Sequence, residues 1–316
     1  RGTGFRQTED LRCKFDSVVV MSEWIDSTTV HCKTPSHAIG HVDLSISNNA
    51  IDFGANISFQ YETLMEPRSI YPSRGPTTGG TIVTLTGSNF RFSPELTCRF
   101  DAEVVPAVFD SSSNQVSCVV PVSDSLKTVR VFISSNGHDF SKENSELLYE
   151  YTHPVVVTKV QPSQGPSHGG TKITIFGSNF KETSTRCMFG KTQVTPSEFV
   201  SSNEIVCVAP LIQSPEFQDG TVTVRVSIND GADFSTNPVR FLTYQGVNIY
   251  ALTPHRGLDV GNTLVTVHGS NFTAYAKDGV RCEFGDETSI ARVLSSTLLE
   301  CTAPAITTNV SKVLFR

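Results

Sequence analysis

Eight cysteines are the side chains of this sequence whose type and spacing most directly indicate chemistry. Thiols can close disulfides or bind zinc, and their spacing separates these uses. Zinc ligands cluster as Cys-x-x-Cys, which this sequence lacks, whereas these cysteines form pairs about 20 positions apart. Each pair therefore predicts a disulfide that stabilises by about 3 kcal/mol and requires an oxidising compartment. The predicted pairs are Cys13 with Cys32, Cys98 with Cys118, Cys187 with Cys207, and Cys282 with Cys301.

Motifs for catalysis are weak or missing. Gly190-Lys191-Thr192 looks like the end of a phosphate-binding loop, but Thr185 stands where that loop needs its first glycine. The sequence has no Gly-x-Ser-x-Gly and no His-Glu-x-x-His motif, and its eight histidines are scattered. We therefore expect no enzyme activity, no bound cofactor and no metal.

Acidic residues recur at loop positions where calcium could bind. Asp52, Asp139 and Asp233 each precede a phenylalanine, and a polar run begins at Asp110 and ends at Asn114. Calcium takes six to eight oxygen ligands, far more than a lone carboxylate supplies. We therefore expect these residues to shape turns and hairpins.

Three asparagines begin Asn-x-Ser/Thr sequences, which accept N-linked glycans in secreted chains. They are Asn56, Asn271 and Asn309. Asn271 is also the third residue of a Gly-Ser-Asn-Phe motif, in which Asn89 and Asn179 stand without a glycan sequence. We therefore expect Asn271 to act as a turn residue as well as a candidate glycan site.

The surroundings of the cysteines repeat four times. The first cysteine of each pair lies in Cys-x-Phe and the second in Cys-x-x-Pro, and free buried thiols would not explain why both members recur together. Gly-Ser-Asn-Phe recurs at Gly87, Gly177 and Gly269, about 90 residues apart. This period matches a small sandwich domain and exceeds that of solenoid repeats. The chain is therefore predicted to be an array of domains.

Short alternating segments dominate each repeat. Residues 81–86 alternate polar and apolar side chains, as do 129–133 and 222–228, and this pattern is typical of half-buried strands. Asn136-Gly137 predicts a tight hairpin turn. Six or seven strands in about 90 residues predict an all-β, immunoglobulin-like sandwich for each module.

The combined motifs resemble those of the IPT/TIG domain, the immunoglobulin-like module of plexins, hepatocyte-growth-factor-type receptors, fibrocystin-like proteins and some transcription factors. The resemblance rests on Ser-x-Gly-Pro-x-x-Gly-Gly-Thr, Gly-Ser-Asn-Phe, Cys-x-Phe and Cys-x-x-Pro, in that order, and covers nearly the whole chain. The last module departs from it, since Leu258 replaces the proline and Asn262 the second glycine. The resemblance implies tandem β-sandwiches of a large extracellular protein.

The motifs divide the chain into module 1 (residues 1–65), module 2 (66–153), module 3 (154–245) and module 4 (246–316). We expect module 1 to lack its N-terminal part, including Gly-Gly and Gly-Ser-Asn-Phe, and module 4 to lack its C-terminal part. The chain would then be an excerpt of a longer array. The linkers, at roughly 62–68, 151–155 and 244–248, are short and not Gly/Ser-rich, which predicts a semi-rigid rod.

Composition narrows the function further. With 25 Lys and Arg against 31 Asp and Glu, the net charge is −6, so a nucleic-acid partner is not expected. No apolar run is long enough to predict membrane insertion within this segment. We expect an extracellular or cell-surface stalk, or a building block of a filament or coat, with other protein chains, copies of itself and N-linked glycans as partners. The alternative is a ligand-binding receptor ectodomain for protein or carbohydrate, in which Trp24 could stack on sugar.

Overall fold

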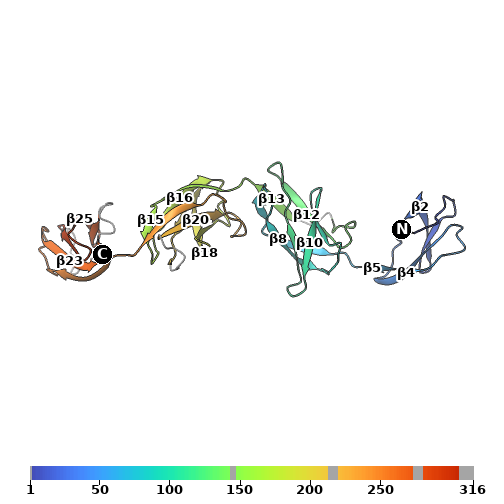
Figure 1. Cartoon of the computed structure of the whole chain (residues 1–316), viewed down its shortest axis with the longest axis horizontal. Coiled ribbons are helices and arrows are strands. Elements are labelled where there is room, and N and C mark those ends of the chain that lie inside the picture. Colours follow the sequence, from blue (N-terminus) through green and yellow to red (C-terminus); the bar gives the residue numbers. More distant parts are fainter. Residues whose placement is uncertain (1, 143–146, 213–219, 273–279, 306–316) are drawn as a thin grey trace. The chain divides into compact units, whose positions relative to one another are not determined.

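The computed structural model describes residues 2–142, 147–212, 220–272 and 280–305. Contacts divide the chain into two compact units, and the boundary between them runs through module 2. The first unit comprises Arg1–Ile70, Thr84–Cys118 and Arg130–Leu147, and the second comprises Tyr71–Val83, Val119–Val129 and Leu148–Arg316. Every element whose bounds the described residues define is a β-strand (Figure 1), which confirms the all-β prediction.

The strands are grouped by the four modules that the sequence predicts. Module 1 contains β1 (Arg12–Phe15), β2 (Val18–Asp26), β3 (Thr29–Cys32), β4 (Gly40–Ser47) and β5 (Ile57–Tyr61). Module 2 contains β6 (Glu66–Tyr71), β7 (Arg74–Pro76), β8 (Ile82–Ser88), β9 (Thr97–Phe100), β10 (Glu103–Asp110), β11 (Gln115–Val119), β12 (Thr128–Ser134) and β13 (Leu148–Thr152). Module 3 contains β14 (Val156–Gln161), β15 (Gln164–Pro166), β16 (Lys172–Ser178), β17 (Arg186–Phe189), β18 (Gln193–Ser201), β19 (Glu204–Val208), β20 (Thr221–Ser227) and β21 (Val239–Tyr244). Module 4 contains β22 (Asn248–Thr253), β23 (Leu264–Ser270), β24 (Arg281–Phe284), β25 (Glu287–Val293) and β26 (Leu298–Thr302).

Modules 2 and 3 share one topology. Their strand orders are β6-β8-β11-β10-β9-β12-β13-β7 and β14-β16-β19-β18-β17-β20-β21-β15. Module 1 has the order β3-β2-β1-β4-β5, and the described strands of module 4 have the order β22-β23-β26-β25-β24. The equivalent strands of the four modules are therefore paired in the same way wherever both are present.

Strand alternation builds the core of module 3. Ile173 and Ile175 on β16 are fully buried, whereas Lys172, the first residue of the same strand, is exposed. Phe189 and Phe241 meet edge to face, with ring centroids 6.2 Å apart, which is a favoured aromatic geometry. The alternation read from the sequence thus corresponds to the inner and outer faces of the strands.

The Gly-Ser-Asn-Phe turn lies at the end of β16 and is hydrogen-bonded to the loop between β18 and β19. In module 3 the amides of Gly177 and Phe180 donate to the carbonyls of Asn203 and Ser202, both at 3.0 Å. Asn179 adopts φ of +68°, a left-handed conformation that asparagine tolerates better than most residues. A Cβ at Gly177 would lie 2.7 Å from the Phe180 ring, so only glycine fits there.

Module 1 carries the same turn at its start, which corrects the expectation that it lacks one. The amides of Gly2 and Phe5 donate to the carbonyls of Thr28 at 2.8 Å and Ser27 at 3.1 Å, matching the bonds in module 3. Gly4 takes the left-handed position, with φ of +80°. The sequence reading missed the turn because Gly-Thr-Gly-Phe replaces Gly-Ser-Asn-Phe. The sequence held one signal of this turn: Gly2 precedes Cys13 by the same number of positions as Gly87 precedes Cys98 in module 2.

Candidate functional site: disulfides, loops and linkers

The structure joins the eight cysteines in the four predicted pairs, one in each module. The Cα atoms of each pair are 6.2 to 6.5 Å apart, a distance at which disulfides form without backbone movement. In each module the two cysteines lie on strands that flank the same middle strand, which is β2, β10, β18 or β25. Each disulfide therefore fastens three neighbouring strands of its sandwich.

One cysteine is more accessible than the other seven. Cys118, Cys207 and Cys301 are at most 2% exposed, whereas their counterpart Cys32 is only half-buried. The reason is the position of β3, which forms the edge of its sheet, whereas β11, β19 and β26 each have neighbours on both sides. Among residues 1–316, the disulfide of module 1 is thus the most accessible to solvent.

The recurrent aspartates lie in a hairpin loop that its own side chains hold together. In module 2 the amide nitrogen Nδ2 of Asn136 donates to Asp139 at 2.8 Å, and Ser134 donates to Asn136 at 3.0 Å. Asn49 and Asp52 form the same bond in module 1, also at 2.8 Å. These aspartates act as hydrogen-bond acceptors that shape the loop, in line with the predicted turn role.

Asn136 shapes the hairpin loop through its side chain and not through the two-residue backbone turn that the sequence predicts. Of Asn136 and Gly137, only the glycine has a positive φ, at +71°. The Asn136 Oδ1 atom accepts from the amides of His138 at 3.0 Å and Asp139 at 2.8 Å. An asparagine that bonds its own following amides forms a turn without the strained backbone of a two-residue hairpin.

The asparagine of Gly-Ser-Asn-Phe has a second role at each linker. Its Nδ2 atom donates to a linker carbonyl in all three modules that have it. Asn89 donates to Leu64 at 3.1 Å, Asn179 to Pro154 at 2.8 Å, and Asn271 to Gly246 at 3.0 Å. Every linker is therefore fastened to the module that follows it.

The three candidate glycan sites lie in different settings. Asn56 is exposed, and its Nδ2 donates to Asp43 at 3.0 Å. Asn271 is half-buried and holds the linker described above, with φ of +67°. Asn309, and the Thr273 that completes the Asn271 sequence, lie outside the described residues.

The remaining residues that the sequence offered as candidate binding sites lie in turns or pack within their own module. The run that begins at Asp110 is a turn, in which the Asp110 carboxylate accepts from the hydroxyls of Ser112 at 2.7 Å and Ser113 at 2.6 Å. These bonds lower the pKa of the Asp110 carboxyl to about 2. Trp24 is half-buried, with its indole nitrogen donating to the Phe5 carbonyl at 3.4 Å. Gly190 lies in the turn between β17 and β18, so it precedes a strand and not the helix that a phosphate-binding loop requires.

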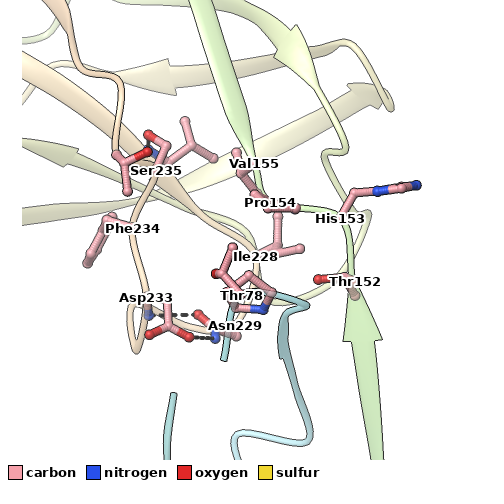
Figure 2. A pocket seen from close by; sticks show the side chains of 13 residues that line it. Thr78, Thr152, His153, Pro154, Val155, Ile228, Asn229, Asp233, Phe234 and Ser235 are labelled. Carbon is pink, nitrogen blue, oxygen red and sulfur yellow. Dashed lines mark hydrogen bonds between the residues drawn. The ribbon is translucent and has the colours of Figure 1, made fainter. Parts of the chain in front are cut away.

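A small hollow lies where module 3 begins, entirely within the second compact unit (Figure 2). Pro76 and Thr78 line it from module 2, and Pro154 from the linker. Ile228 and Phe234 line it from the hairpin loop of module 3, where Figure 2 shows Asn229 and Asp233 hydrogen-bonded to each other. Its walls mix apolar side chains with polar ones, among them Thr152, His153 and Ser235.

Within the ranges that the structure describes, no group of three or more His, Cys, Asp or Glu side chains is placed to hold a metal ion. No helix in the same ranges is long and apolar enough to cross a membrane.

Comparisons with known proteins agree with the repeat pattern. A family model described as the IPT/TIG domain matches residues 1–62, 66–151, 154–243 and 248–316. Human fibrocystin-L is 27% identical over 259 residues, covering 80% of this chain and 6% of its own length. Human plexin-A3 is 28% identical over 249 residues, covering 75% of this chain and 13% of its own length. A solved plexin A4 extracellular region aligns with 95% of this chain and 32% of its own at 18% identity, with a TM-score of 0.42.

Proposed function

Because the chain belongs to the IPT/TIG domain family, we propose that its four modules form a non-catalytic spacer in the ectodomain of a receptor-type protein. Four disulfides require an oxidising compartment, so the chain is secreted or displayed at the cell surface. Similarity to plexin-A3 and fibrocystin-L supports the receptor setting over the filament or coat building block.

The observation that carries the proposal is the fastening of the linkers. A spacer sets distances only if its joints resist bending, and a free linker of a few residues would let modules reorient. Here Asn89, Asn179 and Asn271 each hold a linker carbonyl. Each bond fixes a linker relative to the module that follows it, and this supports a defined connection between neighbouring sandwiches.

The surface supports protein partners and glycans in this role. Loops on rigid sandwiches commonly carry recognition, and we propose that other protein chains bind there. We also propose N-linked glycans at Asn56, Asn271 and Asn309, of which Asn56 has the most exposed setting of the two described sites.

A test combines assembly state and linker mobility in the chain produced in a secreting cell line. The proposal expects a monodisperse monomer in sedimentation and in electron micrographs, with all eight cysteines oxidised in a non-reducing mass map. It also expects narrow single-molecule energy-transfer distributions between labels on modules 2 and 3, broadened by Asn179→Ala. Regular fibres would overturn the spacer in favour of a filament subunit, and broad distributions in the unaltered chain would overturn the fixed joint.

A further inference from the structure

The hairpin loop of module 3, residues 227–235, differs from its counterparts in what surrounds it. Asn49 and Asn136 are exposed in modules 1 and 2, whereas Asn229 is only 3% exposed. All three asparagines bond the aspartate of their own loop at 2.8 Å, so the loop itself has the same internal design. The burial of Asn229 therefore comes from outside the loop.

The groups that cover this loop belong to module 2. Thr81 follows the Gly-Gly turn and is fully buried, and its hydroxyl donates to Asp233 Oδ2 at 2.6 Å. Asn229 Nδ2 donates to the carbonyl of Arg74, on β7, at 3.1 Å. A threonine and a backbone carbonyl of one module thus meet the asparagine and aspartate of the next.

The loop carries an adaptation for this contact. Four positions separate Asn229 from Asp233, against three in the other two loops. The additional length includes Gly231, whose φ of +97° suits glycine, and its amide donates to Ser227 Oγ at 2.9 Å. The longer loop keeps its internal bonds while its aspartate reaches the preceding module.

A buried phenol, that of Tyr149, lies beside the bond between Thr81 and Asp233. Burial raises the pKa of the Tyr149 phenol, against the effect of its bond with Thr81, and the Asp233 charge raises it further. The phenol therefore stays protonated beside Thr81.

A second contact joins modules 2 and 3. Glu150 of module 2 accepts a hydrogen bond from Lys181 of module 3 at 3.1 Å, and it lies 3.5 Å from Arg74 of module 2.

We propose that residues 227–235 form a docking loop that fixes module 3 on the Gly-Gly turn of module 2 through the bond between Thr81 and Asp233. The partner surface is defined by its chemistry: a buried hydroxyl donor and an outward carbonyl at the turn of the preceding sandwich. This concerns one joint, and it holds or fails independently of the spacer role proposed above.

Hydrogen exchange by mass spectrometry on the whole chain tests the docking loop. Loss of a hydrogen bond to a charged group changes a local opening equilibrium by about tenfold or more. We expect Thr81→Val to speed exchange in peptides spanning 227–235 by about tenfold. Thr81→Ser, which keeps the hydroxyl, and Thr84→Val, on β8 just after Thr81, are expected to leave these peptides at the unaltered rate.

Asp233→Asn tests the same bond from the other side, with Asp139→Asn as its matched control in the loop of module 2. If Thr81→Val disrupts all of module 2, the pair of aspartate variants decides alone. Faster exchange in 227–235 for Asp233→Asn, together with faster exchange in 74–81, supports the docking loop. Unchanged exchange in 74–81, or an equal effect of Asp139→Asn on that segment, overturns it.

Discussion

Asn271 donates a hydrogen bond from Nδ2 to the carbonyl of Gly246, 3.0 Å away, so one side chain is both a candidate glycan acceptor and the fastening of the last linker. Asn179 makes the same bond to Pro154 without a glycan sequence. The bond therefore belongs to the fold and not to glycosylation. An attached glycan leaves one N–H on the Asn271 amide nitrogen, and this N–H is enough to keep the hydrogen bond to the Gly246 carbonyl.

Asn179→Ala is expected to lower the free energy of unfolding of module 3 by about 1 to 2 kcal/mol. It removes the hydrogen bond to Pro154 and places a residue with a poor left-handed preference at φ of +68°. Asn179→Gly is the control, because it relieves the backbone but not the lost bond, and should cost less. Urea unfolding followed by hydrogen exchange in peptides of module 3 measures both, and equal stability of Asn179→Ala and the unaltered chain would contradict the linker role.

Much of this architecture could be predicted from local signals. The repeated cysteine pairs, the Gly-Ser-Asn-Phe motif and the alternation in residues such as Ile173 and Ile175 depend on neighbours in the chain. The turn at Gly2 was hidden because two of its four residues are replaced. Thr81 and Asp233 lie 152 positions apart, and their bond depends on how two sandwiches meet, which no periodicity records.

In a folded chain of residues 1–316, the disulfide between Cys13 and Cys32 is expected to be reduced first when dithiothreitol is added. Thiolate attack needs access to a sulfur, and Cys32 is half-buried, whereas Cys98, Cys118 and the cysteines of the later modules are at most 2% exposed. Alkylation at timed intervals and peptide mapping measure the order. Earlier or simultaneous labelling of Cys118 would contradict the role of the sheet edge.

Gly177→Ala is expected to destabilise module 3 by about 2 to 3 kcal/mol. The added methyl group would overlap the backbone carbonyl of Val156 and lie 2.7 Å from the ring of Phe180, which is 2% exposed and has no room to move. Gly2→Ala is the matched variant, because it meets only the half-buried ring of Phe5 and should cost less than about 1 kcal/mol. Thermal unfolding of both variants checks the difference, and similar losses would show that the backbone of Val156 does not set the requirement.

The Asp110 carboxyl is expected to titrate near pH 2. NMR of its side-chain carboxyl carbon over a range of pH measures this titration. Its pKa falls because the hydroxyls of Ser113 and Ser112 donate to the charged form. A carboxyl in the unfolded chain titrates near about 3.9, so the folded pKa lies below the unfolded one. The contribution of Asp110 to stability is then complete above about pH 4 and is lost as the pH falls toward 2.

Removing the two donors tests the cause of this shift. Ser112→Ala with Ser113→Ala leaves the exposed carboxyl in place but without its hydroxyl donors, so its pKa should return toward the unfolded value. Asp110→Asn should lower stability at pH 7 relative to the unaltered chain, and this difference should shrink as the pH falls to 2, where the native carboxyl is itself becoming neutral. A midpoint that stays near 2 in the double serine variant would assign the shift to something other than the turn.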